Sequence, residues 1–310
     1  MPYRLFQLAA VSCAAACAMA LLTSARADTV GVAPVVVPAA AQSRIVSLGG
    51  DVTEILDALG FMDRVIAVDT TSRFPAAVLQ TKPNVGYLRA LSTEGVLSLN
   101  PSVIIASDGA GPPDVVKALK GSSIPYVTVE DDAGAEAVAG KVRSIGAALN
   151  VGEKSEAFAK SIEAQFASLA AERALIKQPK RALIVLAVQN GRAIVGGAGS
   201  SADAMLKLAG AENAVKGMDG FKPVSDEQLA EFAPDAVIVM SRVGETTQKP
   251  IDVVKALKGL QSSPAVTANA VSDMDGLYLL GFGPRTPAAA RDVMAVLYPE
   301  RRADKSEPAR

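Results

Sequence analysis

Histidine and tryptophan are both absent from this chain of 310 residues, and its two cysteines, Cys13 and Cys17, lie close to the N-terminus. Without histidine the chain lacks a ligand that protein sites for zinc and other transition metals commonly use. It also lacks the side chain that most often serves as a general base. These absences argue against a zinc or manganese carrier and against an enzyme that depends on imidazole.

Neither sign of charge dominates, because 31 basic residues stand against 32 acidic ones. A nucleic-acid-binding surface needs a strongly basic field, so the composition predicts no nucleic-acid partner. Half of the residues are hydrophobic, which is enough for a large core in one domain or in two lobes.

Residues 1–27 have the pattern of an export signal. Arg4 precedes an apolar, alanine-rich run from Leu8 to Leu22, and "SARA" (Ser24–Ala27) ends in an Ala-x-Ala pattern, which predicts cleavage after Ala27. The run is shorter than the roughly 20 residues of a membrane span. Cys17 is an alternative lipoprotein acceptor, although "AAAC" lacks the usual leucine. Cleavage after Ala27 leaves a mature chain without thiols or disulfides, and residues 28–43 are expected to form a flexible leader.

The next part of the chain, 44–151, alternates between strand and helix patterns. Apolar runs predict four strands, and Asp51 is expected to cap the helix that follows the first of them. The predicted strands are 44–48, 64–68, 101–107 and 125–129, and the predicted helices are 52–60, 112–121 and 133–149. Such alternation indicates an α/β lobe with a mostly parallel sheet.

A long amphipathic helix is predicted at 153–176, within a connecting segment 152–178 that ends before Pro179. The α/β pattern then resumes over 179–300, with a short tail at 301–310. Apolar runs on both sides of Gln189-Asn190-Gly191 predict a hairpin. "GGAGSSAD" (Gly196–Asp203) is rich in glycine but lacks the Gly-Lys-Ser/Thr ending of a phosphate loop, so it is interpreted as a turn before a helix.

The two halves resemble each other. Leu91–Ser107 aligns with Val224–Met240 without a gap, and this alignment pairs Ser92 with Ser225 and Glu94 with Glu227. Serine as an N-cap with an acid in the first turn explains each site alone. It does not explain why the same proline spacing and the same following strand occur twice. The pattern therefore predicts two similar α/β lobes joined by a single long helix, with a ligand cleft between the lobes.

Three stretches together resemble the periplasmic haem-binding proteins of bacterial haem-uptake ABC transporters, within the larger group of siderophore and cobalamin carriers. They are "VGYLRALSTEG" (Val85–Gly95), "VIVMSR" (Val237–Arg242) and "LYLLGFGPRTPAA" (Leu277–Ala289). The resemblance covers nearly all of the mature chain. It implies a periplasmic, non-enzymatic monomer that clamps ferric haem b in the cleft and delivers it to an importer permease dimer with its ATPase.

The resemblance also assigns residues. It places the axial iron ligand on Tyr87 and an arginine that hydrogen-bonds this tyrosine on Arg242. It also gives Glu94 and Glu227, one in each lobe, as docking points for permease arginines. Tyrosine is one of the few haem ligands left here, but the residues alone favour Tyr87 as a half-buried loop aromatic, and it is the resemblance that favours the iron ligand. Tyr126 and Tyr278 are expected in the core, and Tyr298 lies near the C-terminus.

Several roles stay open at this stage. Arg89 pairs with a haem propionate, positions Tyr87 or is a solvated loop cation. Arg285 caps a helix or lines the cleft. Four residues are candidate walls of a haem site or ordinary core: Phe74, Met218, Phe221 and Met274. A siderophore or corrinoid carrier is the nearest alternative function, and a tetrapyrrole chelatase is a distant one.

Overall fold

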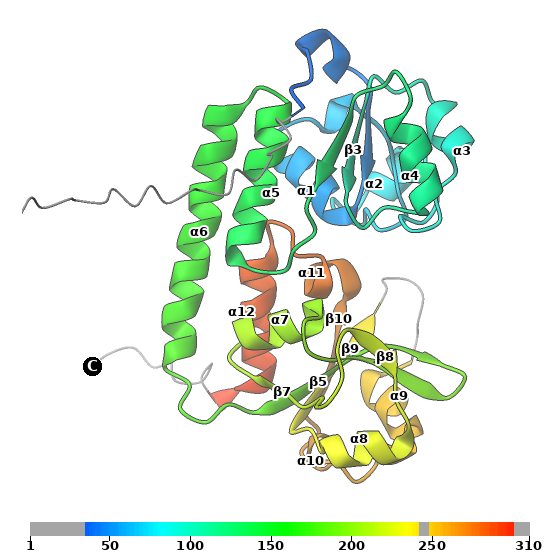
Figure 1. The fold of residues 1–310 in the computed structure, drawn as a ribbon. Helices are drawn as coiled ribbons and strands as arrows, with labels where there is room; N and C mark the ends of the chain where they lie inside the picture. The colour runs from blue at the N-terminus through cyan, green and yellow to red at the C-terminus, as the bar shows by residue number, and fades with distance from the viewer. Residues whose placement is uncertain (1–34, 242–247, 301–310) are drawn as a thin grey trace, which may run out of the picture. The chain divides into compact units, whose positions relative to one another are not determined.

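The computed structural model describes residues 35–241 and 248–300. These residues form two α/β lobes and one long helix (Figure 1). The predicted signal segment 1–27 and the tail 301–310 lie outside the described residues. None of the described helices is both long and apolar enough to cross a membrane.

The N-terminal lobe is built on a sheet of four parallel strands in the order β2-β1-β3-β4. β1 and β3 are buried at every position, as expected for apolar strands covered on both faces. The elements are η1 (Ala39–Gln42), β1 (Ile45–Leu48), α1 (Gly50–Ala58), η2 (Met62–Arg64), β2 (Val65–Val68), α2 (Val78–Thr81), α3 (Thr93–Leu97), β3 (Val103–Ser107), α4 (Pro113–Lys120), β4 (Tyr126–Val129) and α5 (Ala135–Ala148).

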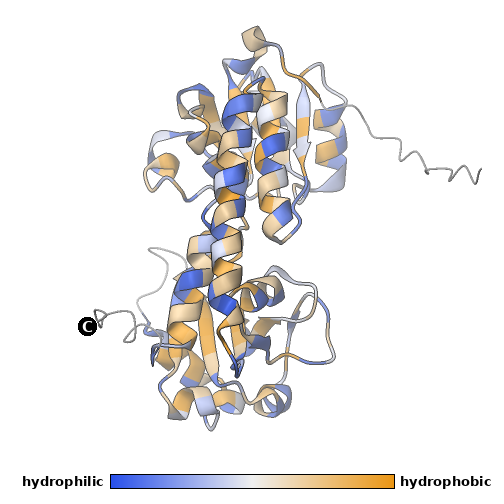
Figure 2. Ribbon diagram, turned by 90° about the vertical axis from the view of Figure 1, so that its left-hand side faces the viewer, coloured by the Kyte–Doolittle hydropathy of each residue, from blue (hydrophilic) through white to orange (hydrophobic). Residues whose placement is uncertain are grey.

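The connecting helix α6 spans Gly152–Ala174 and packs against α5 and α12. Its buried residues lie along one stripe and include Ile162, Phe166 and Leu169. Figure 2 shows hydrophilic residues recurring along the outer side of α6. This pattern confirms the amphipathic helix that the sequence predicts between the two lobes.

The C-terminal lobe contains a mixed sheet in the order β10-β9-β5-β6-β8, with β7 beside β5. β10, β9 and β5 are parallel, whereas β5, β6 and β8 are antiparallel. The elements are β5 (Arg181–Gln189), β6 (Arg192–Gly196), α7 (Ser201–Leu208), β7 (Glu212–Asn213), β8 (Phe221–Pro223), α8 (Asp226–Phe232), β9 (Ala236–Ser241), α9 (Pro250–Ala256), η3 (Lys258–Leu260), α10 (Pro264–Thr267), β10 (Val271–Asp275), α11 (Gly276–Leu280) and α12 (Thr286–Leu297).

The hairpin and the internal similarity are both confirmed. β5 and β6 pair antiparallel, and Asn190 and Gly191 adopt positive φ at the tip, as a two-residue hairpin turn requires. Ser92 and Ser225 are the N-caps of α3 and α8, and each is followed by a buried parallel strand at the corresponding spacing. The antiparallel strands β6 and β8 are where the second sheet departs from the first.

Two local expectations are wrong. Part of the expected leader 28–43 is folded: Val37 is fully buried and its N–H donates to Ala148 O, while the Gln42 side chain donates to Val37 O and Leu149 O. Burial of one apolar side chain and satisfied backbone groups hold this segment on the lobe. Asp51 is not a cap, since Gly49 occupies the N-cap position and the Asp51 carboxylate pairs with Lys141 instead.

A single hydrophobic cluster runs through both lobes. It includes Val52 and Ile55 of α1, Phe166 of α6, and Leu279 and Val293 of the C-terminal lobe. The lobes are therefore joined by shared buried side chains as well as by the chain itself.

Candidate ligand-binding site

Tyr87 lies on a loop that is anchored on both sides by backbone hydrogen bonds. Thr70 N donates to Gly86 O at 2.9 Å, and Gly111 N donates to Leu88 O at 2.9 Å. Gly86 has a φ of 97°, a conformation that favours glycine. Leu88 and Leu91 point into the lobe and are buried. This alternation leaves the side chains of Tyr87 and Arg89 on the outer side of a fixed loop.

Tyr87 is 45% exposed, and it is the most exposed tyrosine of the described residues. Arg89 Nη1 donates to Tyr87 Oη at 3.5 Å, so the guanidinium stands directly beside the phenol. Of the roles left open for Arg89, this contact favours positioning of Tyr87. A half-exposed phenol with a cation beside it is poorly explained as core packing, because it buries little apolar surface.

The other tyrosines have structural surroundings. Tyr298 is 4% exposed and its hydroxyl donates to Gly210 O, in accordance with a core role. Tyr126 and Tyr278 are partly buried and pack against the hydrophobic clusters, in accordance with the expected core role. Burial raises the pKa of Tyr126 to about 12. Burial and the hydrogen bond to Asp292 raise the pKa of Tyr278 to about 12.

Arg242 follows β9 directly in the sequence but lies outside the described residues. β9 runs between β5 and β10 in the second sheet and ends at Ser241. Ligands of open parallel sheets gather at the carboxyl ends of the strands. The predicted role of Arg242 stays a prediction.

Glu94 and Glu227 occupy the first turns of α3 and α8, one helix in each lobe, and both side chains are exposed. Each helix is capped by the preceding serine: Ser92 accepts from Gly95 N, and Ser225 forms a full capping box with Gln228. The hydrogen bond from Ser225 lowers the pKa of Glu227 below its ordinary value. Both carboxylates are therefore available to a partner.

The candidate walls fall into two groups. Met218, Phe221 and Met274 are partly buried and pack against the hydrophobic clusters, as ordinary core residues do. Phe74 is different, because it is 37% exposed. The Arg285 side chain does not cap α12. Its guanidinium pairs with Glu54 and lies 4.0 Å from the Phe74 ring centroid.

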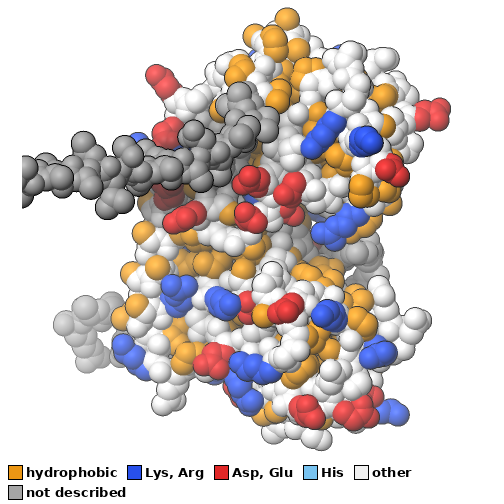
Figure 3. All heavy atoms as spheres, in the orientation of Figure 1, with side chains coloured by type: hydrophobic (Ala, Val, Ile, Leu, Met, Phe, Trp, Pro, Cys, Tyr) orange, Lys and Arg blue, Asp and Glu red, His pale blue; other side chains and the backbone are white. Residues whose placement is uncertain are grey.

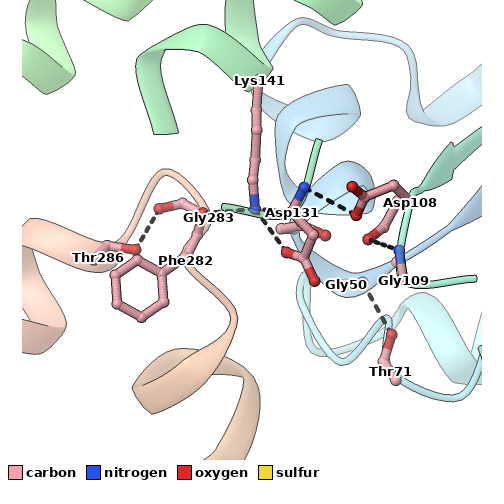
Figure 4. Close-up of polar contacts among 12 residues, drawn as sticks. Gly50, Thr71, Asp108, Gly109, Asp131, Lys141, Phe282, Gly283 and Thr286 are labelled. Atoms are coloured by element: carbon pink, nitrogen blue, oxygen red, sulfur yellow. Dashed lines mark hydrogen bonds and ion pairs between the residues drawn. The ribbon is translucent and has the colours of Figure 1, made fainter. Parts of the chain in front are cut away.

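A group of buried charges was missed at the sequence level. Lys141 of α5 is 3% exposed and donates to Asp51 at 2.6 Å, to Asp131 at 2.9 Å and to Phe282 O of the C-terminal lobe at 3.4 Å (Figure 4). Burial disfavours the lysine charge, but the two carboxylates outweigh it and the pKa of Lys141 is raised. The signal that could have indicated a buried partner is a lysine inside the apolar stripe of a helix.

Figure 3 shows the face in view hollowed between the two lobes, with hydrophobic side chains on both sides of the hollow. A separate cavity of about 600 Å³ lies within the C-terminal lobe. Its lining includes Asp203 and Lys207, which already pair with each other at 2.7 Å. We therefore centre the candidate site on Tyr87 and not on this cavity. Among the described residues, no group of three or more His, Cys, Asp or Glu side chains is arranged to hold a metal ion.

Comparison with known proteins identifies the family. The model of the family described as "Periplasmic binding protein" matches residues 45–277. The chain belongs to this family. It is an extracytoplasmic solute-binding protein and not an enzyme.

An uncharacterized ABC transporter substrate-binding lipoprotein, YvrC of Bacillus subtilis, is 26% identical over 260 residues, which are 83% of this chain and 80% of that protein. The heme-binding protein BhuT, solved with two hemes, is 35% identical with a TM-score of 0.77, over 82% of this chain and 97% of BhuT. The heme-binding protein RhuT from Roseiflexus sp. RS-1 is 33% identical with a TM-score of 0.78, over 83% of this chain and 98% of RhuT. A vitamin B12-binding protein of Vibrio cholerae, at 21% identity, shows only that the fold is shared.

Proposed function

We propose that this protein captures ferric haem through Tyr87 and delivers it to an ABC importer. The observation that carries the proposal is the Tyr87–Arg89 pair, a half-exposed phenol with a guanidinium 3.5 Å from its oxygen, on an anchored loop. Support comes from solved relatives above 30% identity that are named heme-binding.

The chemistry of this pair suits ferric iron. The protein ligands that haem takes are His, Cys, Met and Tyr, and this chain has no histidine. A bound ferric ion favours the phenolate form of a tyrosine ligand. Arg89 is proposed to position the Tyr87 side chain through its contact with the phenol oxygen. Arg242 is proposed to hydrogen-bond the Tyr87 phenolate from the other lobe. The iron–Tyr87 bond forms on capture and breaks on release, and no covalent bond of the macrocycle changes, so the haem leaves unchanged.

The partners follow from the same proposal. The importer is a permease dimer with its ATPase, as the substrate-binding name of the Bacillus relative suggests. Glu94 and Glu227 are proposed to dock onto it from separate lobes, since both are exposed on the first turns of short capped helices. The mature protein is proposed to act in the periplasm after cleavage at Ala27.

The test is a set of titrations of the purified mature chain with ferric haem, metal-free protoporphyrin IX, cobalamin and a ferric catecholate siderophore. The proposal predicts saturable binding of ferric haem that is at least about tenfold tighter than binding of metal-free protoporphyrin, a difference of about 1.4 kcal/mol from the iron–ligand bond. Equal affinity for the two macrocycles would contradict iron ligation. Tight binding of cobalamin or of the siderophore without haem binding would replace the proposed ligand.

A further inference from the structure

Arg285 connects the two lobes through an ion pair with a buried carboxylate. It lies just before α12 in the C-terminal lobe, and its Nη2 donates to Glu54 Oε1 of α1 in the N-terminal lobe. The Glu54 side chain is only 4% exposed. A buried carboxylate without a partner is costly, so Glu54 requires this contact from the other lobe.

The same guanidinium contacts two aromatic rings. Its Cζ lies 4.0 Å from the Phe74 ring centroid of the N-terminal lobe and 5.0 Å from that of Tyr278 in its own lobe. Tyr278 is fixed in turn, because its hydroxyl donates to Asp292 at 2.9 Å. A flat guanidinium can stack and form a hydrogen bond at once, which a lysine ammonium cannot.

Lys141 forms a second polar contact between the lobes close by. Figure 4 shows it reaching from α5 to Asp131 on one side and to the Phe282–Gly283 turn on the other. Phe282 is itself buried in the hydrophobic cluster that the lobes share. Lys141 therefore ties the turn before Arg285 to the N-terminal lobe.

At this place a glycine of each lobe lies close against a side chain of the other lobe. A Cβ atom on Gly50 would meet Leu277 Cδ1 at 2.5 Å, and one on Gly283 would meet Glu54 Oε2 at 3.0 Å. Small sliding of one lobe past the other would separate Arg285 from Glu54 and leave the Glu54 carboxylate buried without this partner. Since buried unpaired charges are penalised, this contact region resists such movement.

Contacts also lead from this region to Tyr87. Gly50 N donates to Thr71 Oγ1 at 3.0 Å, and Thr70 N donates to Gly86 O at 2.9 Å. Phe74 belongs to the same loop as Thr70 and Thr71. The loop that receives Arg285 is therefore hydrogen-bonded to the loop that carries Tyr87.

We propose that Arg285 is a positioning residue of the binding site: by pairing with Glu54 and stacking on Phe74 it fixes the C-terminal lobe against the loop beside Tyr87. It thereby sets the separation between ligand-contacting groups of the two lobes, without touching the ligand. The role of Arg285 in fixing the lobe separation does not depend on which ligand binds. Its role in retaining the ligand rests on the proposed haem function.

The test measures the lobe separation directly. Spin labels on K117C in α4 and K255C in α9, both exposed, report the distance between the lobes in the mature chain, which has no other cysteine after cleavage. We compare the parental protein with E54Q, R285M, R285K and F74L. R181Q is the control, because Arg181 pairs with Asp235 inside one lobe.

The proposal predicts a narrow distance distribution in the parental protein and in R181Q, and a broader or shifted one in R285M and E54Q. R285K keeps the positive charge but lacks the planar guanidinium that stacks on Phe74, so an intermediate distance distribution is expected. F74L removes the aromatic ring that Arg285 contacts, at an exposed position, and a broader or shifted distance distribution is expected. It tests the role of Arg285 if R285M does not fold. Unchanged distributions in E54Q and F74L would overturn the proposal.

Ferric haem dissociation supplies the second readout. The proposal predicts about tenfold faster dissociation from R285M, because interface changes act mostly on dissociation rates. A changed lobe distance with unchanged dissociation would overturn the positioning role. If the parental protein binds no haem, the proposed function fails, and the distance measurements still decide the role of Arg285 in fixing the lobes.

Discussion

At the scale of single residues, the tyrosines differ in their surroundings. For Tyr126 this can be measured as a change of the free energy of unfolding with pH. Tyr126 has a pKa of about 12 in the fold, raised by burial above its ordinary value of 10.0. A group with a raised pKa contributes stability below its unfolded pKa and loses it as the pH rises through the folded pKa. We therefore expect the free energy of unfolding to fall between about pH 10 and about pH 12.

Tyr126→Phe should remove this part of the alkaline loss, since phenylalanine does not ionise. Urea unfolding at a series of pH values measures the effect. An equally steep alkaline loss in the variant would show that Tyr126 does not cause it.

Arg89 is the residue through which the environment of Tyr87 can be changed without removing the proposed iron ligand. Its guanidinium donates to the phenol at 3.5 Å from an exposed position, so we expect a modest effect. Arg89→Gln should weaken ferric haem binding by about fivefold, corresponding to about 1 kcal/mol. Titration of the variant beside Arg192→Gln, an exposed arginine of the other lobe, checks this. Equal affinities in the two variants would leave Arg89 as a solvated cation.

At the scale of elements, α3 and α8 combine two functions that can be separated by substitution. Ser225 caps α8 through both halves of a capping box, so Ser225→Ala should destabilise the protein by about 1 kcal/mol.

Replacing Glu94 and Glu227 together by glutamine should leave both stability and haem affinity almost unchanged. The double variant should instead lose most of its stimulation of the importer's ATPase in membrane vesicles. Full stimulation by the double variant would contradict the docking role.

The long periodic elements could be predicted from the sequence, and the joins between elements could not. The stripe of α6 and the apolar runs of β1, β3, β5 and β9 are local signals, which the structure confirms. Asp51 also gave a local signal, for a helix cap, but its carboxylate pairs with Lys141, 90 residues away. Likewise, nothing near Arg285 in the sequence indicates Glu54 as its partner. Contacts of this kind depend on tertiary packing, which a single sequence does not display.

At the scale of the whole molecule, one of the three hydrophobic clusters of the described residues extends through both lobes and α6. We therefore expect the lobes to unfold together in one cooperative thermal transition, and not one after the other. Leu169→Ala, in the buried stripe of α6, should lower the free energy of unfolding by about 2–5 kcal/mol. Calorimetry of both proteins tests this, and two resolved transitions in the parental protein would contradict a shared core.

The central claim is that Tyr87 binds ferric haem, and absorption spectroscopy of the haem-loaded protein tests it most directly. The parental protein should show the charge-transfer bands of ferric iron bound by tyrosinate. Tyr126→Phe, at the first residue of β4, is the matched control and should keep them. Tyr87→Phe should lose these bands and bind ferric haem no more tightly than metal-free protoporphyrin. Tyrosinate bands that persist in Tyr87→Phe would contradict the account.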